Sequence, residues 1–449
     1  MDNERISFLN KPHIVSLPRL AICLFTAMAF LLHFFTYELS ATVYCVTLIV
    51  LVIVFAITKT TVRYGLSLTY ISSWLLALGV IVYNYLLRYN TNTVLIDLSV
   101  FLSGFVIIIC FSQKADDYTA TLFVIKNLAV FFALGVLIQR LILPLYEVII
   151  QVFPSHIRSA LRTGINATSK IKGFSTNPGF SAGYIIAGIF AVYALIQRDK
   201  LTWKRNLIII LFLMIALLMT GKRGPFLFMI LSIATVRILP ERGSKRFKKL
   251  WFGLMVILAI IVLFFLLQDV LVQIPLLRRL VISIQGFLSG DDISTGRDRL
   301  SAWALQLFRR DPVIGIGWGR YRTTTIGNAT LTKSLDTHNV YLQLLCETGV
   351  IGFAAFTLVF ILSWNMTRKG YCSCFRTDDP NLAKWMPALF FSFIYQTFFL
   401  LYCITGNPLY DQFYQILYTL SCSIAVAYNF AFRKQLKKNS LLCSAMGGA

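Results

Sequence analysis

Long apolar segments separated by short polar breaks recur along nearly the whole chain. Read between those breaks, the sequence predicts twelve helices, near residues 18–37, 40–58, 66–87, 94–112, 119–143, 180–197, 206–220, 225–239, 250–270, 341–364, 385–405 and 411–432. A helix needs about 20 apolar residues to cross a hydrocarbon layer roughly 30 Å thick. The pattern therefore predicts an all-helical integral membrane protein of about twelve transmembrane helices. Because two of the segments are short, eleven or thirteen spans remain alternatives.

The composition supports a membrane protein and argues against several soluble classes. Of 449 residues, 57% are hydrophobic and only 14% are charged, and the mean hydropathy is +0.72. The formal net charge of +23 could indicate a nucleic-acid partner, but cytoplasmic loops of membrane proteins collect Lys and Arg for topological reasons. The nine cysteines lie mostly in apolar segments and lack zinc-ligand spacing. We therefore expect no metal, no cofactor and no nucleic-acid partner.

Basic residues in alternate connections between the predicted helices determine the expected orientation. They gather near residues 59–63, 198–205, 237–249 and 368–376, and in both chain ends. The positive-inside rule makes this side cytoplasmic, with both termini inside. The predicted organisation is a cytoplasmic segment 1–17, helices one to nine over 18–270 with an outer loop 144–179, a large helical extracytoplasmic loop 271–340 carrying the active site, helices ten to twelve over 341–432, and a cytoplasmic tail 433–449.

The segments predicted to lie outside also carry many cations, which topology does not explain. These are Arg158, Arg162, Lys170, Lys172, Lys222, Arg223, Arg278, Arg279, Arg297, Arg299, Arg309, Arg310, Arg320, Arg322 and Lys333. Such a cluster suggests an anionic ligand, for example a diphosphate or a lipid head group. The alternative is that these charges are simply solvated, because long translocated loops tolerate arginine.

The large outer loop contains an amphipathic pattern that begins at Ser294, where a Ser or Thr can cap the start of a helix. Leu300, Trp303, Ala304 and Leu307 follow at helical spacing, and the pattern ends by Asp311-Pro312. We predict a helix lying at the membrane surface. Arg297 and Arg299 would lie near its positive end, where an anion is already favoured.

His338 directly precedes the predicted helix 341–364. A histidine at the outer membrane surface can change protonation near neutral pH, which suits a proton acceptor for a sugar hydroxyl. A helix cap or a structural hydrogen bond is the alternative role. Glu347 falls inside the apolar segment below His338, and an ionisable side chain at that depth is a functional candidate. Its offset of nine residues does not favour direct pairing with His338.

Several motifs of this region resemble one known family. They are Gly296-Arg297-x-Arg299-Leu300-x-x-Trp303, Asp311-Pro312-x-x-Gly315-x-Gly317, His338-Asn339-x-x-Leu342-Gln343 and Glu347-x-Gly349-x-x-Gly352, with further support from Lys222-Arg223-Gly224 and from Gly173-Phe-Ser-Thr-Asn177-Pro178. Together they resemble the O-antigen ligase and Wzy-type polysaccharide polymerase family. The resemblance covers about sixty residues of the loop region.

The resemblance implies a metal-independent, inverting glycosyltransferase of the bacterial cytoplasmic membrane that uses an undecaprenyl-diphosphate-linked oligosaccharide. By position, Arg223 and Arg299 would bind the donor diphosphate and His338 would activate the acceptor hydroxyl. Arg297 is a weaker diphosphate candidate, and Lys222 and Glu347 are secondary candidates. The expected partners are the lipid-linked donor, a glycan or lipid acceptor and the bilayer, with an optional chain-length regulator.

Three functions remain compatible with this pattern. A polymerase would join one lipid-linked repeat unit to another, and we favour it slightly because nothing in the sequence identifies a lipid A core acceptor. A ligase would move the finished glycan to such an acceptor. A lipid-linked oligosaccharide flippase would instead need charges within the spans around a central cavity, and it should tolerate the loss of His338.

Overall fold

The chain is described by a computed structural model that places residues 17–34, 37–57, 67–87, 92–109, 114–163, 170–197, 202–241, 243–249, 251–253, 297–324 and 336–446, together with a few isolated positions. Its longer helices are α2 (Leu17–Leu31), α3 (Tyr37–Ile57), α4 (Leu68–Leu87), α5 (Asn92–Ile109), α6 (Ala115–Leu141), α9 (Pro178–Ile196), α10 (Trp203–Met219), α11 (Arg223–Ile238), α14 (Arg297–Arg310), α15 (Val340–Phe375), α17 (Met386–Tyr402) and α18 (Gln412–Met446). Shorter helices are α7 (Leu143–Ile149), α8 (Ser155–Arg162) and α16 (Pro380–Ala383). No strand occurs within these ranges, so the predicted all-helical class is confirmed.

Eleven of the twelve predicted apolar segments fall on a helix, and the segment 250–270 lies almost entirely outside the described residues. Within the described ranges, five helices are long and apolar enough to cross a membrane: α4, α6, α9, α15 and the first part of α18. Shorter apolar helices, including α2 and α17, accompany them. The protein is a multi-pass membrane protein.

Three helices form the interior of the bundle. Residues 181–192 of α9, 387–399 of α17 and 413–428 of α18 are buried on all sides, as expected for helices that are hydrophobic all round. Helices α6, α10 and α11 pack against α9, α11 packs also against α17, and α15 packs against α17 and α18. Outer helices such as α10 expose large apolar side chains, for example Ile208 at 68%, and these faces suit lipid contact.

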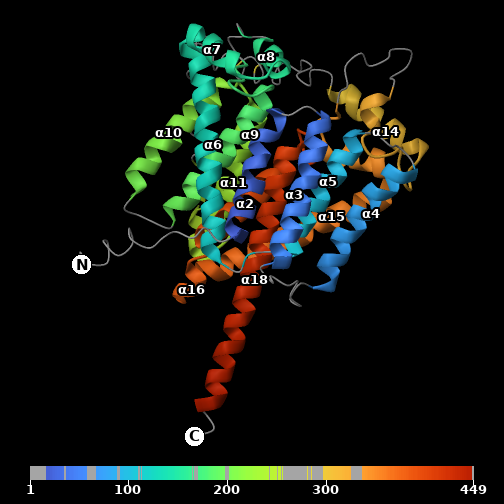
Figure 1. The fold of residues 1–449 in the computed structure, drawn as a ribbon. Coiled ribbons are helices and arrows are strands. Elements are labelled where there is room, and N and C mark those ends of the chain that lie inside the picture. Colours follow the sequence, from blue (N-terminus) through green and yellow to red (C-terminus); the bar gives the residue numbers. More distant parts are fainter. Residues whose placement is uncertain are drawn as a thin grey trace.

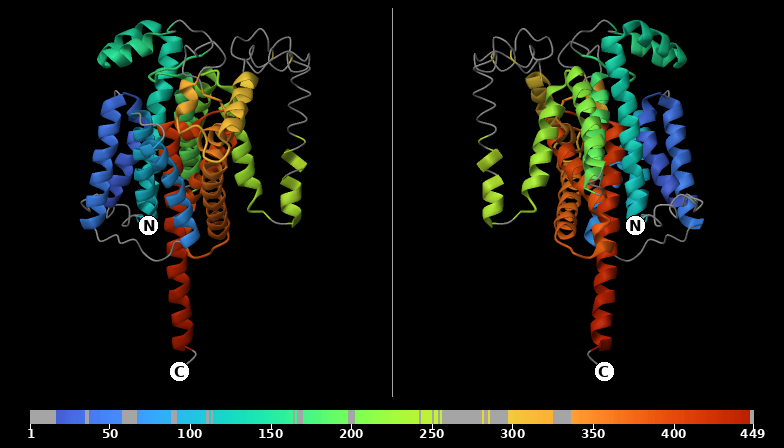
Figure 2. Two further views of the ribbon diagram at one scale, coloured as in Figure 1. Left: turned by 90° about the vertical axis from the view of Figure 1, so that its right-hand side faces the viewer. Right: turned by 90° about the vertical axis from the view of Figure 1, so that its left-hand side faces the viewer.

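The short helices mark the two ends of the bundle. Figure 1 shows α7, α8 and α14 at one end and α16 at the other, with the last part of α18 projecting beyond the bundle. Both side views in Figure 2 show the same projection. The segments 144–179 and 271–340, which the sequence assigns to one face of the membrane, therefore have their described helices at one end of the molecule.

The amphipathic helix of the loop forms as predicted. Helix α14 buries Leu300, Trp303, Ala304 and Leu307, and its last residue is Arg310. This apolar face packs against α15, and Trp303 Nε1 donates a hydrogen bond to Thr324 Oγ1 at 3.0 Å. The Ser294 and Thr295 expected to cap the helix lie outside the described part of the chain.

Candidate functional site

His338 lies directly before α15, next to the residue that caps this helix. Its φ of +55° is the left-handed conformation, and no other non-glycine residue in the described ranges has positive φ. Thr337 Oγ1 donates to the Asn339 carbonyl at 2.7 Å, and the Asn339 side chain caps α15 by accepting the Leu342 N–H at 3.2 Å. These bonds fix the backbone on both sides of His338, just before the first turn of α15.

His338 lines a cavity of about 510 Å³ near the α14 end of the bundle. The other walls come from α2, α5, the start of α9, the α10–α11 turn, the loop before α15 and the loop between α17 and α18. The lining residues that bear charged, amide or phenol groups are Asp97, Asn177, Tyr184, Lys222, Arg322, Asp336, Tyr402, Asn407, Tyr410, Asp411, Gln412 and Tyr414. The cavity thus combines cations, carboxylates and aromatic rings next to one histidine.

An ion pair connects the loop after α14 to the residues before His338. Arg322 donates from Nε and Nη2 to the two Asp336 oxygens at 2.5 and 2.9 Å. This two-point geometry is specific to a guanidinium and a carboxylate. The Asp336 charge raises the pKa of Arg322 against the opposing effect of burial. Sequence reasoning counted Arg322 only among the outer cations, and it did not predict this pair.

Glu347 is buried two residues before the kink at Gly349 in α15, and it bonds to the protein backbone. Its carboxylate accepts the N–H of Gly319 at 2.9 Å and that of Tyr321 at 3.1 Å. Gln343 Nε2 lies 3.3 Å from Glu347 Oε1 and 3.3 Å from Asp336 Oδ1. Glu347 therefore connects α15 to the Arg322 loop, and among the described residues no bond joins it to His338.

The glycine motifs have a packing explanation. Gly349 adopts φ +63° at a kink in α15, and a Cβ there would lie 2.3 Å from the Val313 carbonyl carbon. A Cβ at Gly315, with φ +71°, would lie 2.3 Å from the Glu347 carbonyl carbon. The Gly317 N–H donates to the Glu347 carbonyl at 2.9 Å. The loop and the kinked helix meet backbone to backbone, which only glycine permits.

The six residues proposed from the sequence do not gather at one point. Lys222 lines the cavity with His338, whereas Arg223, Arg297, Arg299 and Glu347 do not line it. Arg297 nevertheless lies close enough for its charge to affect both His338 and Lys222, and its Nη1 donates to the Thr405 carbonyl at 3.4 Å. The side chains of Arg223 and Arg299 are exposed.

Burial and neighbouring cations alter the acid–base properties of the site. Burial lowers the pKa of His338 below its ordinary value, and the charges of Arg297 and Lys222 lower it further, whereas Asp336 opposes them. Burial also lowers the pKa of Lys222, together with the charges of Lys170 and Arg297. His338 is therefore favoured in its neutral form near neutral pH, as a proton acceptor requires.

The loop between α17 and α18 supplies residues that sequence reasoning did not select. Asn407 Nδ2 donates a hydrogen bond to Gln343 Oε1. Burial raises the pKa of Asp411 to about 7, although the hydrogen bond that its carboxylate accepts from the Phe413 N–H lowers it. The available signal was the polar stretch Thr-Gly-Asn-Pro-Leu-Tyr-Asp at 405–411, between two strongly apolar segments.

The family comparison covers the part of this site that holds His338 and Lys222. Residues 207–357 match the family model described as O-antigen ligase. Over this region the chain is similar to the O-antigen ligase family. The family supports an O-antigen ligase-like or polymerase-like membrane function, hence a glycosyl-transferring enzyme acting on lipid-linked glycan. A search of the curated proteins found no match.

The matched region contains the α14 helix, the glycine motifs and most of the cations, but not the whole cavity. Lys222, Arg322, Asp336 and His338 lie within residues 207–357, whereas the wall formed by 402–414 lies outside them. In the described ranges, no group of three His, Cys, Asp or Glu side chains is arranged to hold a metal ion.

Proposed function

We propose that this protein polymerises undecaprenyl-diphosphate-linked repeat units at the outer face of the bacterial cytoplasmic membrane, by a metal-independent transfer that inverts the anomeric carbon. The observation that carries the proposal is His338, shifted toward its neutral form, beside Lys222 in a 510 Å³ cavity of the O-antigen ligase region. Polymerisation remains our preference over ligation because no feature of the chain identifies a lipid A core acceptor.

In this mechanism His338 acts on the acceptor. A ring nitrogen accepts the proton of an acceptor hydroxyl while that oxygen attacks the anomeric carbon of the donor sugar. The bond from the anomeric carbon to the diphosphate oxygen breaks, and the electron pair leaves with the polyprenyl diphosphate. Attack from the side opposite the leaving group inverts the carbon.

The departing diphosphate needs positive charge. Arg322 also lines the cavity but is already held in an ion pair, so two other cations are the candidates to provide it. Lys222 lines the cavity, and Arg297 influences both Lys222 and His338 through its charge. We propose that these two contact the diphosphate and stabilise the charge that develops on it. Arg223 and Arg299 are exposed, and we assign them to diphosphate capture at the membrane surface.

The wall formed by the α17–α18 loop and the start of α18 suits a sugar. Tyr402 and Tyr414 offer ring faces and hydroxyl groups, and Asn407 and Asp411 offer amide and carboxyl groups. Such a combination of apolar surface and a few polar groups orients a small ligand. We propose that the acceptor sugar binds against this wall.

The proposed orientation places the His338 cavity outside and both termini in the cytoplasm. Its support is the basic character of the opposite connections, near residues 198–205, 237–249 and 368–376. Cysteine labelling from each side of the membrane tests it. A single cysteine at Arg309 should react with an impermeant reagent added outside, and one at Lys434 should not.

The deciding experiment is an in vitro assay with purified protein, an undecaprenyl-diphosphate-linked repeat unit and EDTA throughout. Wild type should form longer glycans, and His338→Ala should lower the rate by roughly a hundredfold or more, the contribution of a general base. His156→Ala is the matched control, since His156 is exposed on α8 at the same end of the bundle.

Other results of this assay would replace the proposal. Product that forms only after a separate lipid or protein acceptor is added would establish a ligase. Equal activity of His338→Ala and wild type would remove the assigned base. Glycan movement across proteoliposomes that survives the loss of His338, without new linkages, would indicate a flippase.

A further inference from the structure

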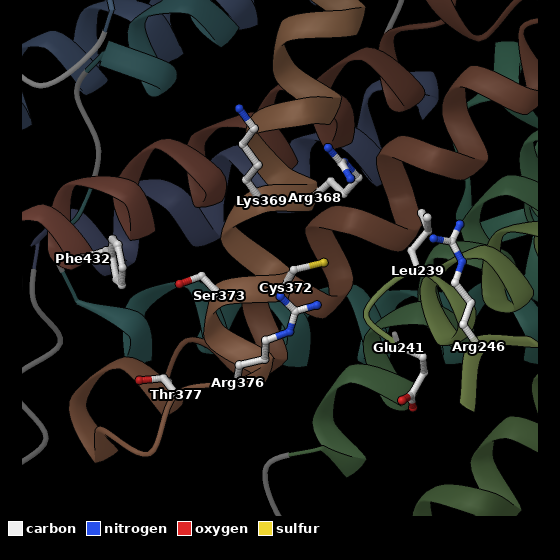
Figure 3. A pocket seen from close by; sticks show the side chains of 10 residues that line it. All are labelled: Leu239, Glu241, Arg246, Arg368, Lys369, Cys372, Ser373, Arg376, Thr377 and Phe432. Carbon is white, nitrogen blue, oxygen red and sulfur yellow. The ribbon is translucent and has the colours of Figure 1, made fainter. Parts of the chain in front are cut away.

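A second pocket, of about 680 Å³, lies at the opposite end of α15 from His338. Its lining residues are Leu239, Glu241, Arg246, Arg368, Lys369, Cys372, Ser373, Arg376, Thr377 and Phe432, drawn in Figure 3. They come from the end of α11 and the segment after it, the last turns of α15, the residues just beyond α15, and α18. About 28 helical residues separate Arg368 from the start of α15, roughly 40 Å along the helix.

The pocket carries a strong excess of positive charge. Among the described residues, four cations line it and one carboxylate, that of Glu241. That carboxylate already bonds to Lys249 Nζ at 2.5 Å, so it does not neutralise the lining cations. Arg376 is held in place because its Nη2 donates to the Pro240 carbonyl at 2.9 Å.

Arg368 shows an unmet hydrogen-bonding requirement. Its Nε is buried and has no hydrogen-bond partner in the described part of the chain. The guanidinium carbon lies 5.8 Å from the Trp364 ring centroid. This cation–π contact does not provide a hydrogen-bond acceptor for the Nε–H group. A buried donor left without an acceptor is unfavourable, and a phosphate oxygen is a strong acceptor.

Topology alone does not explain this arrangement. The positive-inside rule accounts for many Lys and Arg residues at one end of the bundle, including the exposed Arg246, Lys369 and Arg376, but it does not explain Arg368, whose Nε is buried. Here residues from three helices converge around one cavity that is also lined by Leu239 and Phe432. A ligand with a phosphate and an adjoining apolar chain would match both the cations and the apolar side chains that line this pocket.

We propose that this pocket binds a phosphate group carried by an anionic membrane lipid, with Arg368 and Lys369 as its main contacts. The same phosphate chemistry could come from a soluble phosphate compound, and the apolar wall is what favours the lipid. This site is independent of glycosyl transfer, because it shares no lining residue with the His338 cavity.

The test is native mass spectrometry of the purified full chain after exchange into nanodiscs of phosphatidylglycerol or phosphatidylcholine. Wild type should retain phosphatidylglycerol and not phosphatidylcholine, and Arg368→Gln with Lys369→Gln should lower retention by about tenfold or more, the effect of losing charge-assisted bonds. Arg246→Gln is a second variant, on an exposed side chain whose loss should leave the fold intact. Lys434→Gln, an exposed cation outside the pocket, is the control.

Inorganic phosphate, titrated against the detergent-solubilised protein, separates the two sources. Protection from heat by millimolar phosphate that disappears in Arg368→Gln, without selective lipid retention, would support the phosphate site and assign it to a soluble ligand. Equal retention of both lipids by wild type, with no phosphate effect, would overturn the proposal. Retention by a monodisperse Arg368→Gln/Lys369→Gln variant equal to that of the control would overturn it as well.

Discussion

Replacing Glu347 with alanine should release the loop that carries Arg322 without unfolding the bundle. The Glu347 carboxylate is the acceptor for the N–H groups of Gly319 and Tyr321, at 2.9 and 3.1 Å. Each buried N–H that loses its acceptor costs about 1–3 kcal/mol, so the variant should lose roughly 2–6 kcal/mol of loop stability. Even the lower value corresponds to about a thirtyfold change in an opening equilibrium.

Amide hydrogen exchange, followed by mass spectrometry on peptides that contain residues 317–324, measures this change directly. Protection there should fall by about thirtyfold or more in Glu347→Ala, while peptides from the interior helices α9 and α17 keep theirs. Glu347→Gln should lose less, because its side-chain oxygen can still accept one of the two N–H groups. Glu147→Ala, on the exposed face of α7, is the control.

The same experiment separates the anchoring role of Glu347 from a chemical one. If Glu347 acted only on substrate, activity would fall while exchange of the loop stayed within about threefold of wild type, less than 1 kcal/mol. That result would refute the reasoning from the two hydrogen bonds. A parallel loss of activity and protection would agree with a carboxylate that positions the site through the loop.

Three further predictions follow from the site. Activity should fall as the pH drops through the His338 pKa, which lies below 6.5, because His338 can act as a base only when it is neutral. Arg297→Gln removes a charge that lowers this pKa, so it should shift the acid limb of a pH–rate profile to higher pH. Asp336→Asn should lower the free energy of unfolding by roughly 1.5–3 kcal/mol, because it removes the ion pair with Arg322. A thermal unfolding curve that does not differ from wild type would contradict this. Gly349→Ala should sharply reduce the folded yield in fluorescence-detected size exclusion, since left-handed φ costs an alanine about 1–2 kcal/mol before the 2.3 Å overlap is counted. Gly79→Ala, with no atom within 4 Å of its Cβ, should not reduce it.

The sequence predicted periodic features well because they depend on local pattern. The apolar positions of α14 are Leu300, Trp303, Ala304 and Leu307, and the structure buries the same four. The apolar segments likewise indicated where helices form, although α15 continues to Phe375 rather than ending near 364. A hydropathy pattern marks the membrane-length part of a helix, whereas this helix extends past it into a basic stretch.

The hydropathy pattern and the motifs could not predict which side chains from separate elements come into contact. Arg322 and Asp336 each looked like one of many loop charges, and only the fold brings them into a two-point contact. Asp411 enters the cavity from a loop some 70 residues after His338, and it belongs to none of the motifs. Arg299 matched a motif, yet its side chain is exposed because α14 directs its apolar face toward α15.

The motifs of the loop region combine packing with chemistry, and the structure separates the two. Gly315 and Gly349 allow two backbones to meet, and Glu347 binds the loop that follows, so none of the three needs to touch a substrate. An ionisable group at membrane depth is usually examined for catalysis, but here two backbone donors account for the burial of Glu347. His338 differs because its side chain lines an open cavity. A loss of activity after mutation of the motif glycines or Glu347 would therefore report on how the site is positioned, and only His338 and the cations near it can test the proposed transfer itself.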